Sequence, residues 1–223
     1  MNSKNILLVE GEADRGFFEA LCKMLNLSVI VVKTPKDDGG THNTKEGVKN
    51  HLERIVLPSI PRGLYENIGI IIDADQKENG GGYERTFQRF STVLQDYTHD
   101  SSIKNGLIFT SNDGLPDIGL WIMPNNQDNG MLEDWIKICR HPNENTLFQH
   151  AQNSIDAIPN GAKFKDLHRS KAEIATWLAW QKNPDHGLYY AANKELLDTQ
   201  SPLFQKLEQW LKHLFPTAST APA

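Results

Sequence analysis

The stretch N-I-G-I-I-I-D-A-D, residues 67–75, is an apolar run that ends in two carboxylates one residue apart. Such a run is typical of a strand that is buried on both faces of a parallel sheet, and ligands collect beyond the carboxyl ends of these strands. We therefore expect Asp73 and Asp75 at a ligand-binding edge. Because strand side chains alternate, the two carboxylates are expected to point to the same side and to share or bridge a divalent cation.

Strand and helix patterns alternate on both sides of this run. Short apolar runs bounded by turn residues predict further strands at 6–9, 29–32, 107–110 and 118–123. Apolar residues at helical spacing predict helices at 14–25, 48–56 and 83–97. The turn-rich segment 34–44 is long enough to be a functional loop, although its His42 is expected to be an ordinary loop residue. The alternation predicts an α/β fold with a mostly parallel sheet flanked by helices.

Beyond residue 140 the strand signals fade. Helices are predicted there at 147–158, 170–181, 194–197 and 201–215. We therefore expect an α/β domain at 1–140, a helical C-terminal region at 141–216 and a short flexible tail at 217–223. Trp177, Trp180 and Trp210 in this region are expected to be core residues rather than a platform for stacking nucleobases.

Composition limits the class of protein. The chain has 223 residues, of which 39% are hydrophobic and 23% charged, as in ordinary globular proteins. Its net charge of -5 argues against nucleic-acid binding through a broad basic surface, but a bound cation reverses the local sign at an acidic site. Two isolated cysteines, no signal-peptide pattern and no apolar run near ~20 residues predict a cytoplasmic protein without a membrane span.

Further acidic residues follow other predicted strands. Glu10, Gly11 and Asp14 stand where the first strand gives way to its helix, and the glycine would let the backbone approach a phosphate or a metal ion closely. If the first and third strands are neighbours, Glu10 faces the two aspartates across the crevice. Glu133 and Asp134 add carboxylates at a helix start after a later strand.

This set of oxygen ligands favours hard cations. With no Cys or His pair nearby, it selects Mg²⁺ or Mn²⁺ over zinc. Such ions polarise phosphoryl oxygens, generate hydroxide from bound water and stabilise attacking and leaving oxygens. The residues therefore indicate cleavage or transfer of phosphodiesters.

Several motifs together resemble the Toprim domain. A strand leads into E-G-x-x-D at residues 10–14, and a later strand ends in D-x-D at 73–75. The segments G-L-W-I-M-P-N-N (119–126) and G-M-L-E-D-W (130–135) look like the small stand-alone Toprim proteins of the OLD-family nuclease branch, many of which are uncharacterised. The core resemblance covers residues 4–140.

The resemblance implies a Toprim-like α/β fold, Mg²⁺- or Mn²⁺-dependent phosphodiester chemistry and a role for each motif residue. In this reading Glu10 is a metal ligand or general acid/base, and Asp14, Asp73, Asp75 and Glu133 hold metal. A downstream lysine expected in this branch maps onto Lys171 in H-R-S-K. Gly11, Asp134 and His168 are candidates for supporting the ligands or binding phosphate, His168 also for shuttling a proton.

Among Toprim activities, a nuclease acting on DNA or RNA fits best. A topoisomerase would need a separate domain with a nucleophilic tyrosine, and a primase would need a zinc-binding region. OLD-type nucleases usually carry an ATPase domain, but no G-x-x-x-x-G-K-[ST] motif occurs here, so an ATPase would be a separate partner. A homo-oligomer is also left open.

Other interpretations remain open from the residues alone. A HAD-like phosphohydrolase also has an apolar strand ending in D-x-D, although that family places the motif near the first strand and here Gln76 and Lys77 follow it. A non-catalytic metal- or nucleic-acid-binding module that acts with an ATPase partner is a third reading. Acids at a helix start also simply complement the helix dipole, and Lys171 could be a surface lysine.

Overall fold

A single mixed sheet organises the molecule. The computed structural model describes residues 4–28, 31–39, 42–99 and 106–217, so residues 29–30 of the predicted second strand lie outside the described part. The strands are β1 (Asn5–Leu8), β2 (Val31–Lys33), β3 (Asn67–Asp73), β4 (Thr98–His99), β5 (Leu107–Thr110) and β6 (Ile118–Met123), in the spatial order β2-β1-β3-β6-β5-β4. The first four strands of this order run parallel, which confirms the predicted α/β class.

The far edge of the sheet is antiparallel, which is consistent with the predicted mostly parallel sheet, but it includes one strand that was not predicted. β5 pairs antiparallel with β6, and the two-residue β4, which was not predicted, pairs antiparallel with β5. β5 and β6 are separated by only seven residues, 111–117, and a parallel crossover needs a dozen or more. On this side of the sheet, β5 and β6 therefore form a β-hairpin rather than a parallel pair joined by a crossover.

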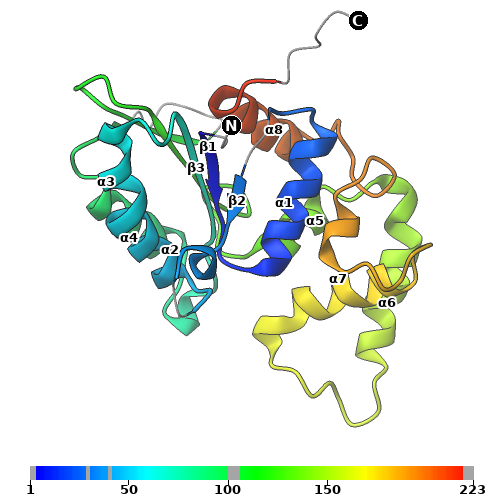
Figure 1. The fold of residues 1–223 in the computed structure, drawn as a ribbon. Helices are drawn as coiled ribbons and strands as arrows, with labels where there is room; N and C mark the ends of the chain where they lie inside the picture. The colour runs from blue at the N-terminus through cyan, green and yellow to red at the C-terminus, as the bar shows by residue number, and fades with distance from the viewer. Residues whose placement is uncertain (1–3, 29–30, 40–41, 100–105, 218–223) are drawn as a thin grey trace, which may run out of the picture.

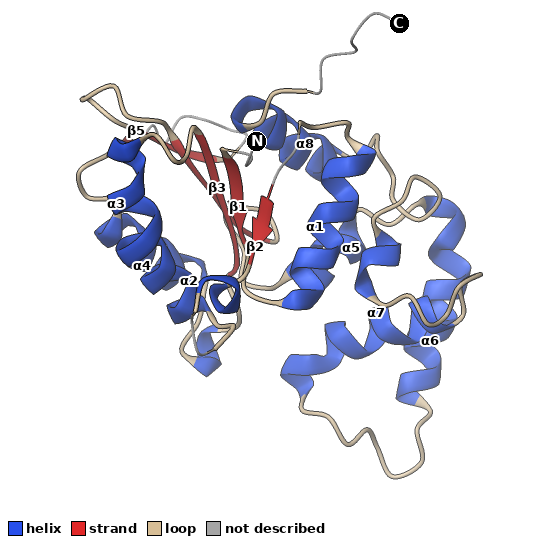
Figure 2. Cartoon of the chain, viewed as in Figure 1, coloured by secondary structure: helices blue, strands red, loops and turns tan. Residues whose placement is uncertain are grey.

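Helices cover both faces of the sheet (Figures 1 and 2). They are α1 (Glu12–Met24), α2 (Lys45–His51), α3 (Leu57–Ser59), α4 (Tyr83–Val93), α5 (Leu132–Ile138), α6 (Asn145–Asp156), α7 (Arg169–Ala179) and α8 (Pro202–Leu214). A π-helical turn, Leu52–Val56, joins α2 to α3. Among the described residues, no helix is long and apolar enough to cross a membrane.

Two hydrophobic clusters result, one on each face. Ile68, Ile70 and Ile72 of β3 point into the cluster formed with α2, α3 and α4, whereas Ile71 points into the cluster formed with α1, α5, α7 and α8. This alternation is that of a strand buried on both faces, as the apolar run predicted. Burying each such side chain contributes roughly 1.5–3 kcal/mol.

The helical C-terminal region shares a core with the sheet. The cluster that includes Leu7 also includes Trp177 and Trp210, so it crosses the boundary predicted at residue 140. Close packing here depends on Gly119 of β6, since a Cβ at that position would lie only 2.1 Å from Leu214 Cδ1 of α8. α8 therefore lies directly on the sheet.

Two predictions for this region are wrong. Residues 194–197 form a turn rather than a helix, because the Asn193 carboxamide oxygen accepts hydrogen bonds from the Glu195 and Leu196 amides and so closes a local turn. Trp180 was predicted in the core but is 40% exposed, since α7 ends at Ala179. Trp177 and Trp210 are buried, as predicted.

Candidate metal centre

The site begins where β1 and β3 end side by side. Their parallel pairing brings Glu10, just beyond β1, to Asp73, the last residue of β3. The Asp73 amide donates a hydrogen bond to Glu10 Oε1 at 3.3 Å. The expectation that the first and third strands are neighbours, with Glu10 facing the D-x-D motif, is therefore confirmed for Asp73.

Asp14 joins them from the first turn of α1. Its Oδ2 accepts a hydrogen bond of 3.0 Å from the Gly11 amide, so the carboxylate caps its own helix. A Cβ at Gly11 would lie 3.3 Å from the same oxygen. Gly11 thus leaves room for the carboxylate, and a side chain in its place would press against Asp14.

The start of α5 completes the cluster. The Leu132 amide donates to Asp73 Oδ1 at 3.0 Å, which fixes α5 against the end of β3. The next residue, Glu133, is only 7% exposed. Its Oε1 accepts a hydrogen bond from Lys171 Nζ at 3.0 Å, while its Oε2 is buried and has no hydrogen-bond partner among the described residues.

The orphaned oxygen is energetically unusual. Nearly all buried polar atoms in native proteins have a partner, and an unsatisfied one costs about 1–3 kcal/mol, more for a charged group. An ion or a water molecule at this position would remove the cost. The oxygen is therefore an acceptor that an ion or a water molecule could bind.

A small cavity lies between the carboxylates. It is lined by Glu10, Asp14 and Asp73 on the polar side and by apolar residues that include Phe18 and Leu132, and it encloses about 10 Å³. That volume is roughly the size of one water molecule or ion. Within the described ranges, no three His, Cys, Asp or Glu side chains are arranged so that they could hold a metal ion as they stand. The choice of metal ligands is therefore a proposal.

Burial and mutual repulsion dominate the electrostatics of the cluster, although Lys45 and Lys171 partly offset them. Burial, with Asp75 and Asp14 nearby and against the influence of Lys45, raises the pKa of Glu10 to about 7. Burial and Glu133 raise the pKa of Asp14 to about 6. Burial, together with Glu10, Asp14 and Glu133, raises the pKa of Asp73 well above its usual range. Perturbed carboxylates of this kind concentrate at functional sites.

Lys171 reaches the cluster from α7. Burial lowers the pKa of its ammonium, but Glu133, Asp73 and Asp14 more than offset this effect, and the net pKa is raised. The side chain is 49% exposed, so it borders both the acids and solvent. The structure therefore brings the predicted lysine to the predicted acids, although Lys171 and Glu133 are 38 positions apart in the chain.

Asp134 supports the cluster through hydrogen bonds, whereas no hydrogen bond or ion pair joins His168 to it among the described residues. Asp134 Oδ2 accepts from the Met131 amide at 3.1 Å, and Oδ1 accepts from the Ser170 hydroxyl, so this residue caps α5 and ties it to α7. The tie holds the helix that carries Lys171. His168 is exposed at the residue that precedes α7.

Asp75 has different neighbours from Asp73. β3 ends at Asp73, and Asp75 adopts a left-handed backbone conformation with φ 61°, so the alternation expected of a strand does not extend to it. Its carboxylate is 46% exposed and accepts a hydrogen bond from Lys45 Nζ at 2.7 Å. Sequence reasoning missed Lys45, because the first residue of a helix after a turn-rich loop carries no motif.

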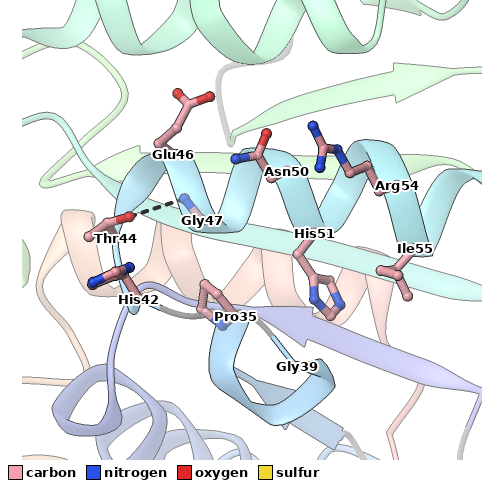
Figure 3. Close-up of a pocket in the computed structure, with 10 residues that line it drawn as sticks. All are labelled: Pro35, Gly39, His42, Thr44, Glu46, Gly47, Asn50, His51, Arg54 and Ile55. Atoms are coloured by element: carbon pink, nitrogen blue, oxygen red, sulfur yellow. Dashed lines mark hydrogen bonds between the residues drawn. The ribbon is translucent and has the colours of Figure 1, made fainter.

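A larger pocket lies along α2, the helix that begins at Lys45 (Figure 3). It has a volume of about 470 Å³ and lies between the short 3-10 helix Pro35–Asp38 and α2 with its π-helical continuation. The predicted long loop therefore contains a turn of helix and forms one wall, with His42 among the lining residues. Pro35, Gly39, His42, Thr44, Glu46, Gly47, Asn50, His51, Arg54 and Ile55 line the pocket.

Comparison with known proteins identifies a family. The family model described as "Protein of unknown function (DUF3226)" matches residues 4–216. No curated protein and no solved structure matches the chain.

Proposed function

Because the chain belongs to the DUF3226 family, whose description assigns no function, we propose one from the geometry of the acidic edge: Mg²⁺- or Mn²⁺-dependent cleavage of phosphodiester bonds in DNA or RNA by a Toprim-type site. The observation that carries the proposal is a cavity lined by three carboxylates, with a fourth, Glu133, interacting electrostatically with two of them through a side chain whose buried Oε2 has no partner among the described residues. A divalent cation is the ligand that such a site would take.

The residues present fit the ion. Asp14, Asp73 and Glu133 supply hard oxygen atoms from three different elements. Burial and their mutual repulsion raise the pKa values of Asp14 and Asp73, and a bound cation would lower both values. We assign these three residues to the ion. When bound, Mg²⁺ or Mn²⁺ would polarise the phosphoryl oxygens of the substrate.

The remaining charged residues have separate tasks. The half-exposed ammonium of Lys171 would neutralise charge that develops on the phosphoryl oxygens. Glu10, whose pKa is about 7, would accept the proton of the attacking water while the water oxygen bonds to phosphorus and a P–O ester bond breaks. The departing oxygen would take its proton from solvent.

The pocket of Figure 3 is a candidate site for part of the substrate. Its volume of about 470 Å³ is that of a typical small-molecule site and would accept a nucleoside. Asn50 can hydrogen-bond a base edge, and Arg54 can bind a neighbouring phosphate. We expect this activity in the cytoplasm, with any ATP coupling supplied by a separate partner.

The test is cleavage of labelled single- and double-stranded DNA and RNA by the purified protein with Mg²⁺ or Mn²⁺. Asp73→Asn and Glu133→Gln should each lower the rate at least about 100-fold, since each removes a proposed ligand. Asp113→Asn, in the exposed turn before β6, is the matched control and should leave the rate unchanged. Cleavage that persists in a protein carrying both Asp73→Asn and Glu133→Gln would refute the assignment of these residues to a metal site. An aspartyl-phosphate trapped on Asp73 would favour the HAD-like alternative.

A further inference from the structure

We propose that the ammonium group of Lys45 takes the place of a second cation, so that the acidic edge binds one divalent ion rather than two. This inference rests on the proposed function, because it concerns the number of ions at the same site. It assigns Lys45 and Asp75 to a fixed ion pair, and it leaves the divalent ion to Asp14, Asp73 and Glu133.

Lys45 Nζ sits in a cage of oxygen atoms. It donates to Asp75 Oδ2 at 2.7 Å, to the Ala74 carbonyl at 3.2 Å and to the Thr86 hydroxyl at 3.3 Å. An ammonium has three protons, and each has an acceptor here. The side chain is 11% exposed. A carboxylate, a carbonyl and a hydroxyl around one positive centre are also the donors that a hard cation would collect.

The cage is rigidly held. Its three oxygen atoms come from the segment after β3 and from α4, and Lys45 itself is the first residue of α2. Thr44 caps that helix by accepting from the Gly47 amide at 3.1 Å, and Thr86 is buried at 2% exposure. The ammonium is therefore a fixed point charge and cannot swing away to admit an ion without breaking these contacts.

The acidic edge is thereby divided in two. On one side, Lys45 balances Asp75 and also lowers the pKa of Glu10. On the other side lie Asp14, Asp73 and Glu133, which have the half-exposed Lys171 as a cationic neighbour. The first half already contains its positive charge, whereas the second contains the buried carboxylate oxygen that has no partner among the described residues. The second half is therefore the one that has reason to bind a divalent ion.

The experiment counts Mn²⁺ ions per chain, using Mn²⁺ alone, by electron paramagnetic resonance of free Mn²⁺ and by calorimetry. The wild-type protein should bind one ion. Lys45→Met, which keeps the length of the side chain and removes its charge, should bind two. Lys49→Met is the matched control on the same helix, because Lys49 pairs with Glu46 at 3.2 Å instead of with the site, and it should bind one.

A second variant keeps the inference testable if Lys45→Met does not fold. Asp75→Asn should still bind one Mn²⁺ ion, with a Kd within about threefold of the wild type, whereas Asp73→Asn should lose it. Two ions in the wild type, one ion in folded Lys45→Met, or loss of the ion in Asp75→Asn would each overturn the inference while leaving a metal-dependent function standing. Absence of Mn²⁺ binding by the wild type would overturn the proposed function and this inference together.

Discussion

Two lysines serve the acidic edge in opposite ways. Lys45 is 11% exposed and donates to three oxygen atoms, so every proton of its ammonium group is hydrogen-bonded within the protein. Lys171 is 49% exposed and donates to a single oxygen, that of Glu133, among the described residues. A buried and fully bonded ammonium acts as structure, whereas a half-exposed one can turn part of its charge toward an incoming anion. We therefore expect Lys45 to contribute mainly to the stability of the fold and Lys171 mainly to catalysis, and variants of the two lysines can measure this difference.

The largest expected effect is on catalysis by Lys171→Met. If the ammonium neutralises the transferring phosphoryl group, its loss should lower kcat about 100- to 1000-fold, in the range of a lost oxyanion donor. Steady-state cleavage of a labelled oligonucleotide measures this effect. Lys163→Met, in an exposed segment of the same region, should be neutral. Equal activity of Lys171→Met and the wild type would mean that Lys171 is an ordinary surface lysine without a catalytic role.

The next effect is a pH dependence that comes from Glu10. The pKa of Glu10 is about 7 in the folded protein and about 4.5 normally, so the folded state binds more protons than the unfolded state between these values. Its contribution to stability is present below about pH 4.5 and is lost as the pH rises through about 7, a loss of roughly 3 kcal/mol at most.

Urea unfolding of the metal-free protein from pH 5 to pH 8 measures this dependence. Glu10→Gln should flatten the profile, and Mn²⁺ should restore stability at pH 8, because the ion binds the deprotonated carboxylates. Stability that rises steadily across this range in the wild type would contradict the raised pKa.

A smaller effect compares the two lysines in folding. Lys45→Met should destabilise the protein by about 1–3 kcal/mol, since it leaves Asp75 without its counter-ion and the Thr86 hydroxyl without the ammonium that donates to it, although the Ala74 carbonyl still accepts from the Gly82 amide at 2.7 Å. Lys171→Met should destabilise the protein by about 1 kcal/mol, because it removes a single hydrogen bond from a half-exposed ammonium to the buried Glu133 carboxylate. Thermal unfolding of both variants at pH 7 makes the comparison. Equal losses would remove the distinction between them.

The smallest effect concerns the support of Lys171. Ser170→Ala removes the hydroxyl that joins Asp134 of α5 to α7 and should cost about 1 kcal/mol of stability. Activity should fall only a few fold, because Lys171 remains but is held less firmly. Ser154→Ala, which removes a hydroxyl bonded within α6, is the control for helix effects alone. A loss of activity as large as that of Lys171→Met would mean that Ser170 itself has a part in the chemistry.

Much of the fold follows from local patterns. The run 68–72 is typical of a strand buried on both faces, and residues that end parallel strands meet at one edge, so the sequence predicted that Glu10 faces Asp73 if the first and third strands are neighbours, as the structure shows them to be. Glu133 was found because it follows a strand at a helix start. These predictions depend on the local periodicity of each segment and on the general geometry of parallel sheets.

The predictions that failed or were missed depend on contacts that a local pattern does not carry. Asp75 was expected beside Asp73, but the backbone leaves the strand at Asp73 and the Gly130 carbonyl accepts the Asp75 amide at 2.8 Å. Lys45 gains its importance from Ala74 and Thr86, which lie 29 and 41 residues away. The direction of β5 depended on the short connection to β6 rather than on the composition of the strand.

The fit of Leu214 against Gly119 also bears on how the protein is made. α8 packs against β6 on one face of the sheet, and it is the last helix in the described part of the chain. While the protein is being synthesised, that face has no such cover until α8 has left the ribosome. We therefore expect the nascent chain to expose an apolar surface to chaperones until α8 has been synthesised and has packed on the sheet.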